Sequence, residues 1–383
     1  MKCLVIILML IINFPLFSYC KSNEDNACLN FKESIKLDNS EINIKIKDIT
    51  SDKNTNKYLL LNKVNSLIIK KLDKNNALIW ETKIDAIGVN ILQNSENEIY
   101  ITTYYNKDLN LEINNKKIII KSNNTNALLI LKLNTQTGSL INYLNISTNY
   151  GVLPTTAKFK ENKLYIAGYY GGKSEFLEKK GYEDAFLLIL DENLKKIYSK
   201  SIIRKGFIAI DSIKIGNESI YLKTNEKKFY KIGKKTKKIE EILKGANVKF
   251  FEIDKNENIY AITYNNILKK FDNTQKLLVT NNLKDFDYVV TPSKIKVKKT
   301  GLFIEYFAKI EYRNNIIISK YDLNLKNIWH NAILGASYFN GVFKIINKKL
   351  YLFGNYSGDL KLSDEINFYS LKASNFLFLF EIH

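Results

Sequence analysis

The sequence predicts an all-β fold, a seven-bladed β-propeller with four antiparallel strands in each blade. Seven short apolar strands carry an aromatic residue at the same place, in settings such as NEIYIT, NKLYIAG and KKLYLFG. Successive aromatic residues are 39 to 65 residues apart, and strand-only repeats of about 40–50 residues are typical of propeller blades. We call these residues the anchors: Tyr58, Tyr100, Tyr165, Tyr221, Tyr260, Phe303 and Tyr351.

The third unit shows the predicted blade most clearly. Its strands are expected at 153–159, 163–169, 185–190 and 196–202. They are rich in Ile, Leu, Tyr and Phe and are bounded by Asn, Asp and Gly, which is the pattern of β-hairpins. Because each strand returns beside the previous one, the four strands form one antiparallel blade.

Turn-forming residues recur in register with the anchors. A glycine precedes five anchors by 12 to 16 residues, where a crossover between blades can need positive φ. These are Gly88, Gly151, Gly206, Gly245 and Gly335. An Asp or Asn opens the last hairpin of five units, where its side chain can bond the backbone two residues on. These are Asp73, Asn134, Asp191, Asp272 and Asp322.

The two ends of the chain are expected to close the ring together. The last unit ends with a third strand at 375–380 and lacks a fourth strand. Residues 29–37 precede the first inner strand and have the length of the missing strand. We therefore expect the N-terminal strand to join the C-terminal blade, which removes free sheet edges.

The N-terminus has the composition of an export signal and is set apart from the fold. Lys2 precedes an apolar stretch at 4–17, which is well short of the about 20 residues that span a bilayer. Residues 16–20, LFSYC, resemble the lipobox of bacterial lipoproteins, in which the cysteine is lipidated. Cys20 is therefore the predicted lipidation site, and ordinary secretion with cleavage after it is the alternative.

These features divide the chain into three predicted parts. They are a lipoprotein-type signal peptide at 1–20, a tether at 21–28 and the propeller at 29–383. A lipid on Cys20 would make the membrane one partner of the protein, because acyl chains contribute about 0.8 kcal/mol per buried methylene.

Positive charge dominates the composition, and the formal net charge is +19. This charge indicates either a polyanionic partner or lysines that solvate exposed strand faces and block edge pairing. We favour the second interpretation, because the lysines are spread along the whole chain. Arg204 and Arg313 are the only arginines, so nucleic acid is not expected as a partner.

No metal and no cofactor are expected. The segment 254–258 lacks the spacing of a calcium loop and contains a lysine. Cys28 is interpreted as a small, half-buried apolar residue. The two histidines, His330 in an outer strand and His383 at the last position, do not support histidine metal sites or catalytic triads.

The third unit also resembles a known repeat. Residues 184–191, DAFLLILD, are similar to the core of the bacterial seven-bladed beta-propeller (SBBP) repeat, and IAGY at 166–169 is similar to its upstream strand. The second and seventh units resemble longer variants with an extra hairpin, here at 109–122 and 360–371. The resemblance implies an exported bacterial propeller and no single activity.

Catalysis is not expected from these residues. Two arginines cannot form the arginine cluster of sialidase-type propellers. Trp80 and Trp329 are the only tryptophans, whereas quinone-dependent dehydrogenase propellers repeat tryptophan at their blade ends. The alternative is a periplasmic or surface carbohydrate-active enzyme that uses a pair of carboxylates.

Aromatic residues end several of the second strands. We expect them on one rim of the ring, where exposed rings could bind a peptide or a sugar; the alternative is that they pack between blades. The candidate ligand-binding residues are Tyr105, Tyr170, Tyr264, Tyr306 and Tyr356.

The function that follows is a non-catalytic ligand-binding or scaffold propeller lipoprotein. We expect a monomer in the bacterial cell envelope, lipid-anchored at the outer membrane or cell surface, or otherwise secreted. A surface module that binds an external protein or glycan is one version. An inward-facing scaffold, similar in architecture to the propeller lipoprotein of outer-membrane protein assembly, is the other.

Overall fold

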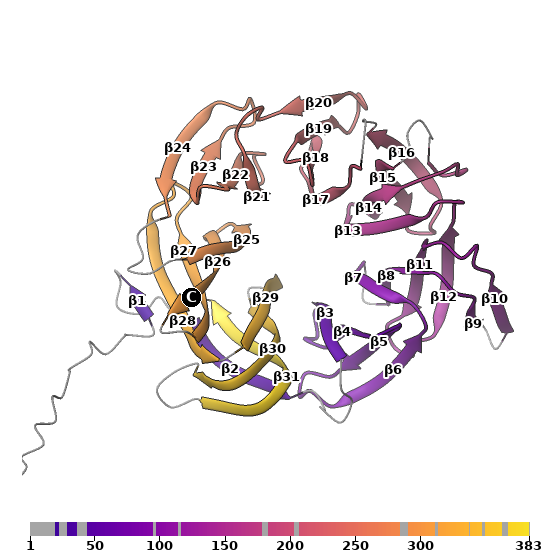
Figure 1. Ribbon diagram of the computed structural model, residues 1–383, viewed down its shortest axis with the longest axis horizontal. Coiled ribbons are helices and arrows are strands. Elements are labelled where there is room, and N and C mark those ends of the chain that lie inside the picture. Colours follow the sequence, from indigo (N-terminus) through magenta and orange to yellow (C-terminus); the bar gives the residue numbers. More distant parts are fainter. Residues whose placement is uncertain are drawn as a thin grey trace, which may run out of the picture.

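A computed structural model shows the propeller as a ring around a central opening (Figure 1). The structure describes residues 20–22, 29–36, 44–94, 97–113, 116–177, 183–202, 207–283, 290–310, 313–336, 338–346, 349–361 and 367–382. Residues 1–19 of the expected signal peptide, residues 23–28 of the expected tether, Gly206 and His383 lie outside these ranges. Within the described ranges, no helix is long and apolar enough to cross a membrane.

Seven blades of four antiparallel strands make up the ring, as the sequence predicts. Blade one contains β3–β6 (Ile44–Ser51, Lys57–Lys63, Ser66–Leu72, Leu78–Ile84). Blade two contains β7 (Ile87–Gln93), β8 (Glu98–Tyr105), β11 (Ala127–Asn134) and β12 (Leu140–Ile146). Blade three contains β13–β16 (Val152–Lys160, Lys163–Tyr170, Asp184–Asp191, Lys196–Ile202).

The second half of the ring repeats this arrangement. Blade four contains β17–β20 (Ile210–Ile215, Ser219–Thr224, Phe229–Gly233, Ile239–Ile242). Blade five contains β21–β24 (Val248–Ile253, Ile259–Thr263, Ile267–Phe271, Leu277–Asn282). Blade six contains β25–β28 (Val290–Lys298, Gly301–Ile310, Arg313–Tyr321, Asn327–Ala336). Blade seven contains β29 (Tyr338–Ile346), β30 (Lys349–Lys361), β31 (Asn367–Ile382) and β2 (Leu29–Lys36).

The anchors hold neighbouring blades together. All seven lie on the second strand of a blade, and at most 2% of each side chain is exposed. The described apolar residues form seven clusters, each shared by two adjacent blades, and each anchor belongs to the cluster that joins its blade to the next. Tyr351 of blade seven, for example, packs with Ile46 and Ile49 of blade one.

Lysines on the third strands cover the anchor rings. In five blades a lysine lies directly opposite the anchor in the sheet: Lys71, Lys132, Lys231, Lys270 and Lys320. The Nζ atoms of the first four are 5.5–5.8 Å from the centroids of the anchor rings. These contacts are cation–π interactions, and they account for part of the lysine content within the sheets.

Turn chemistry follows the expectation at most positions. Asp73 accepts backbone hydrogen bonds from Asn75 and Ala77, both at 2.8 Å, and Asp191, Asp272 and Asp322 accept the equivalent pairs. Gly151 has a φ of +101°, as a crossover glycine should. Gly88 is needed for a different reason, because a Cβ there would lie 2.8 Å from the Leu60 side chain.

The N-terminal strand closes the ring, which confirms the expectation. Strand β2 pairs antiparallel with β31, from Leu29 opposite Ile382 to Lys36 opposite Phe376, and the two strands lie side by side in Figure 1. The short strand β1 (Cys20–Ser22) pairs with β28, the outer strand of blade six, with Cys20 opposite Asn331.

Both predicted extra hairpins are present. In blade two, β9 (Leu109–Ile113) pairs with β10 (Lys116–Ile120). In blade seven the hairpin is formed by the extended ends of β30 and β31, which pair as far as Lys361 opposite Asn367. A single pair, Leu334 opposite Lys361, links this extension to blade six.

Closure by β2 leads to a stability prediction. Deletion of residues 1–36 should lower the midpoint of thermal unfolding by about 10 °C or more, because β31 keeps β30 but loses its other strand partner and becomes an open edge. Deletion of residues 1–28 keeps β2 and serves as the control. Equal midpoints for the two deletion variants would show that β2 is not needed for closure.

Candidate functional site

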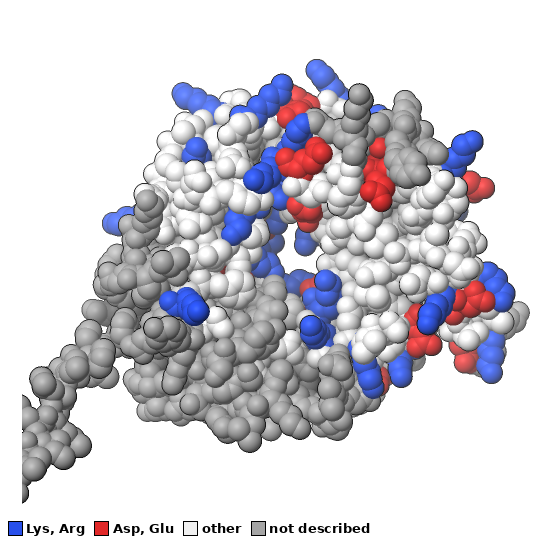
Figure 2. All heavy atoms as spheres, in the orientation of Figure 1, with Lys and Arg blue, Asp and Glu red and all other residues white. Residues whose placement is uncertain are grey.

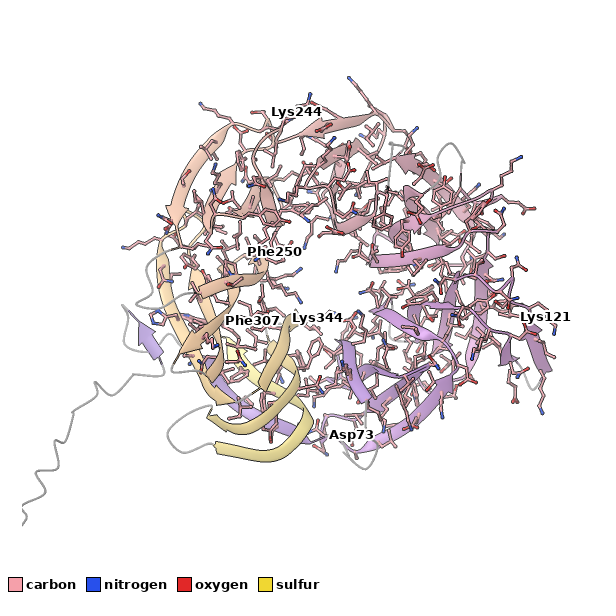
Figure 3. All side chains as sticks on the ribbon, in the orientation of Figure 1. Asp73, Lys121, Lys244, Phe250, Phe307 and Lys344 are labelled. Atoms are coloured by element: carbon pink, nitrogen blue, oxygen red, sulfur yellow. The ribbon has the colours of Figure 1, made fainter. Side chains whose placement is uncertain are left out.

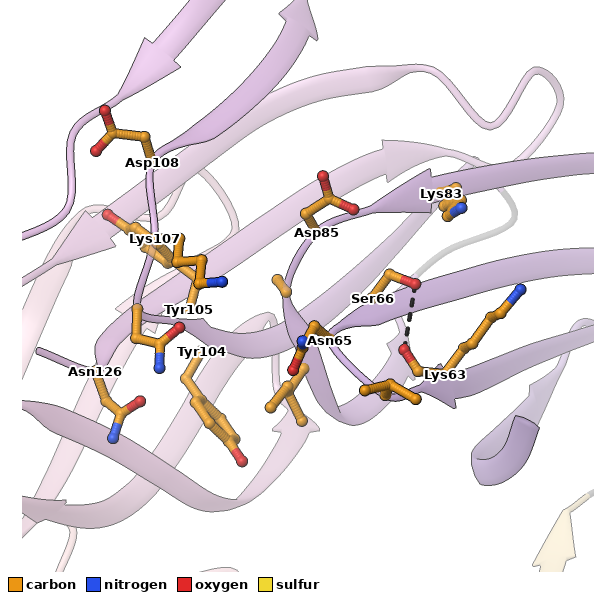
Figure 4. Close-up of a pocket in the computed structure, with 14 residues that line it drawn as sticks. Lys63, Asn65, Ser66, Lys83, Asp85, Tyr104, Tyr105, Lys107, Asp108 and Asn126 are labelled. Atoms are coloured by element: carbon orange, nitrogen blue, oxygen red, sulfur yellow. Dashed lines mark hydrogen bonds between the residues drawn. The ribbon is translucent and has the colours of Figure 1, made fainter. Parts of the chain in front are cut away.

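One face of the ring carries a pocket between blades one and two, here called the rim pocket (Figure 4). Its volume is about 450 Å³. It is lined by the β4–β5 turn (63–66), the crossover from β6 to β7 (83–87) and the end of β8 with the following loop (104–108). The end of one second strand, β8, and one inter-blade crossover therefore meet at this pocket.

Several polar side chains in the rim pocket are not used by the protein itself. Asn65, Asp85 and Asn106 are exposed and Asn126 is half-buried. Among the described residues, none of these four side chains has a hydrogen-bond or ion-pair partner. Tyr104, which is half-buried, supplies an aromatic face beside them. The pocket thus offers amide and carboxylate groups together with one ring.

Asp108, at the outer edge of the rim pocket, differs from these four residues because its carboxylate is bonded within the protein. Lys121 Nζ lies 2.7 Å from its carboxylate, and the backbone N–H of Ser122 donates a hydrogen bond of 2.8 Å to it. These bonds hold the pKa of Asp108 below its usual range. The carboxylate therefore stays ionised.

The prediction that the five candidate tyrosines are exposed is wrong for four of them. Tyr105, Tyr170, Tyr306 and Tyr356 are buried, and only 3% of the Tyr105 side chain is exposed. Tyr264 is 41% exposed and lies under Lys227, whose Nζ is 4.2 Å from the ring centroid. The rings of the first four pack inside the blades or between them, which was the alternative interpretation.

The buried tyrosines use their hydroxyl groups within the fold. Tyr105 donates to Asn145 Oδ1 at 2.9 Å, on the fourth strand of the same blade. The Tyr170 hydroxyl lies 2.6 Å from that of Ser201, again on a fourth strand. Strand alternation explains these positions, because neighbouring residues in a strand point to opposite faces of the sheet. The second tyrosine of each Tyr-Tyr pair points into the core.

The first tyrosine of each pair is the more exposed one, and sequence reasoning missed it. Tyr104 and Tyr169 are half-buried at the ends of β8 and β14. Burial, with the nearby Glu183 and Tyr104, raises the pKa of Tyr169. The ring of exposed Phe207 makes an edge-on contact with Tyr169 at 4.8 Å between centroids. An aromatic strip therefore extends from Tyr104 in blade two through Tyr169 in blade three to Phe207, which precedes β17 of blade four.

A layer of charged residues lines the central channel, and sequence reasoning missed it too. Each anchor lies opposite one residue of the innermost strand of its blade, so these seven residues occupy the same level of the strands that surround the channel. In blade order they are Thr50, Leu92, Lys158, Lys214, Glu252, Lys296 and Lys344. Figure 2 shows blue side chains around the central opening, and Lys344 is labelled there in Figure 3. We call these seven residues the channel layer.

Carboxylates pair with three of the four lysines in the channel layer. Lys214 forms an ion pair with Glu252 Oε1, and Lys296 Nζ lies 3.2 Å from the same oxygen. Burial alone would raise the pKa of Glu252, but the two lysines bring it down to about 2. Lys344 Nζ lies 2.8 Å from Asp48, two residues before Thr50, and likewise holds the pKa of Asp48 below its usual range against the effect of burial.

These lysines correct the interpretation of lysine as a purely exposed residue. They lie half-buried on inner strands, not on the solvated outer faces. The segment 254–258 uses its own carboxylate in its turn, because Asp254 accepts from the backbone N–H groups of Asn256 and Asn258. No group of three or more His, Cys, Asp or Glu that could hold a metal ion occurs in the part of the chain that the structure describes.

Comparison with known proteins supports the fold. No protein-family model matches the chain, and no curated protein matches its sequence. Among solved structures, BamB from Moraxella catarrhalis is similar, with a TM-score of 0.50 and 12% identity over 93% of this chain and 100% of that chain. The extracellular domain of a hybrid two-component system from B. thetaiotaomicron matches with a TM-score of 0.47 and 11% identity, over 93% of this chain and 43% of that chain. The likeness to BamB shows the propeller fold alone, and the resemblance to the SBBP repeat stays a prediction.

The structural role of Tyr105 can be tested by removing its hydroxyl. Tyr105→Phe should lower the free energy of unfolding by about 1 kcal/mol, because Asn145 Oδ1 loses its donor in a partly buried site. Tyr104→Phe is the matched control and should change stability little. Denaturant unfolding measures both variants. A larger effect at Tyr104 than at Tyr105 would contradict the assignment of the two rings.

Proposed function

We propose that the protein is a non-catalytic ligand-binding propeller of the bacterial cell envelope, held at a membrane by a lipid on Cys20. The rim pocket carries the proposal. Its volume of about 450 Å³ is within the range of roughly 300–1,000 Å³ that small-ligand sites occupy. The side chains of Asn65, Asp85, Asn106 and Asn126 have no partner among the described residues, so a ligand can bind them without breaking bonds of the fold.

The chemistry of the rim pocket favours a carbohydrate as the ligand. Asn65 and Asn106 offer both donors and acceptors, and Asp85 offers acceptors, which suits a surface of hydroxyl groups. Tyr104 and Tyr169 supply half-exposed rings against which the apolar face of a sugar can pack. The aromatic strip beyond the pocket offers rings from more than one blade, which favours a chain of sugars over a single one.

A binding role fits the carboxylates of the rim pocket better than glycoside hydrolysis does. Hydrolysis by a carboxylate pair requires one acid that remains protonated, with a raised pKa. Asp108 has the opposite property, since Lys121 and the Ser122 N–H lower its pKa. Asp108 is therefore suited to hold Lys121 in place and unsuited to donate a proton.

The scaffold version has one observation in its favour. The outer strand β24 of blade five exposes Leu277 and Leu278, and the outer strand β6 of blade one exposes Leu78 and Ile79. Apolar residues on an edge strand suit a partner that adds a strand to the sheet. The rim pocket remains the stronger candidate, because it brings together more unpartnered groups.

Binding of the purified protein to an array of bacterial surface oligosaccharides tests the proposal. At least one oligosaccharide should bind, and Tyr104→Ala should weaken its affinity about tenfold, as expected for the loss of a stacking ring. Ile197→Ala is the control, because Ile197 is exposed on the outer strand β16 of blade three, away from the pocket, and it should leave the affinity unchanged.

Two results would overturn the rim-pocket assignment. One is equal binding by the wild type and Tyr104→Ala. The other is the absence of binding to every oligosaccharide while the protein is folded. Either result makes the edge strand β24 the next surface to examine, by placing a photo-crosslinking residue at Leu278.

A further inference from the structure

Positive charge exceeds negative charge in the channel layer. Four of its lysines come from blades three, four, six and seven, and they face two carboxylates, Glu252 of blade five and Asp48 of blade one. The lysines approach from different sides of the ring. An excess of ammonium groups that converge on an enclosed space is the arrangement that attracts an anion.

Lys158 is the lysine that the fold leaves uncompensated. The other three have the carboxylate partners described above, whereas Lys158 has no hydrogen-bond or ion-pair partner among the described residues. It lies on β13, where it faces Lys214 on β17, Lys296 on β25 and Lys344 on β29, with Asp48 on β3 and Glu252 on β21 as the negative groups. Three like charges therefore act on a half-buried ammonium group that has no directly bonded carboxylate among the described residues, and Asp48 and Glu252 offset them only in part.

We propose that the central channel binds a small multivalent oxyanion of the sulfate or phosphate type, centred on Lys158 and flanked by Lys214, Lys296 and Lys344. Tetrahedral oxyanions accept hydrogen bonds in several directions, so they can satisfy ammonium groups from different blades together. A monovalent anion such as acetate would leave part of the positive charge unbalanced. This site is separate from the rim pocket and does not depend on the function proposed for it.

Proton binding should be coupled to anion binding. Burial, together with the charges of Lys296, Lys214 and Lys344, lowers the pKa of Lys158 to about 7. An anion beside Lys158 favours its charged form, so binding near neutral pH takes up a proton. Affinity should therefore be highest below pH 7 and should fall as the pH rises through and above it.

Sulfate is the appropriate probe, because its own charge does not change between pH 6 and pH 9. Isothermal titration of the purified full chain with sodium sulfate, at ionic strength held constant with sodium chloride, should show saturable binding. The affinity should fall by about tenfold between pH 6.5 and pH 8.5. Sodium acetate should bind far more weakly, and inorganic phosphate should compete with sulfate.

The variant Lys158→Gln removes the central ammonium group. It should weaken sulfate binding by about tenfold or more and reduce the pH dependence, of which Lys294, with a pKa lowered by burial to about 8, contributes the remainder. Without sulfate it should be at least as stable to heat as the wild type, because the repulsion from three lysines is relieved. Lys255→Gln, in an exposed turn, removes the same charge and should bind sulfate as the wild type does. If Lys158→Gln does not fold, Lys296→Gln tests the same site, since Glu252 keeps Lys214 as its partner.

Three outcomes would overturn the proposal. The first is no sulfate binding by the wild type at about 10 mM, far above the range expected for several charge-assisted hydrogen bonds. The second is an equal loss of binding in Lys158→Gln and Lys255→Gln, which would indicate general surface charge. The third is a Lys158→Gln variant that is less stable without sulfate and binds it unchanged, which would give Lys158 a structural role only.

Discussion

The packing of one aromatic ring per blade against the next blade is the interaction on which the whole ring depends. Each anchor is buried on the second strand of its blade and belongs to the apolar cluster shared with the following blade. A sheet with one apolar face must bury that face against another layer, and a propeller does so seven times in a circle. The last contact, between Tyr351 and blade one, closes the circle, and β2 supplies the outer strand of blade seven.

The same register determines what faces the channel. The residue that lies opposite a buried anchor on the innermost strand occupies the same level of the ring in every blade, whether its side chain is charged or not. In this chain the position holds four lysines and one glutamate, so the constraint that builds the ring also gathers charge at its centre. Buried charges are costly unless they are paired. Glu252 and Asp48 offset part of that cost by pairing with lysines. Lys158 has no such pair among the described residues, so the cost of burying its charge is not offset in this way.

Sequence reasoning succeeded where the signal was a periodic spacing of residues. It failed where the answer depended on which side of the sheet a side chain points to. The anchors, the four-strand blades, the closing strand and both extra hairpins were predictable, because spacing and turn residues report them directly. The rim tyrosines were misassigned because Tyr104 and Tyr105 are adjacent, and a shift of one residue reverses the side of the sheet. The four channel lysines each stand seven positions before an anchor, so a register argument could have found them. Their ion pairs join different blades and require the closed ring.

A crystal structure of the full chain, grown in sulfate, tests the central claim most directly. The account predicts a ring of seven blades with all seven anchors between blades, and with Lys158, Lys214, Lys296 and Lys344 in one layer of the channel wall. A ring in which the anchors lie on the surface, or in which these four lysines point away from the channel, would contradict it.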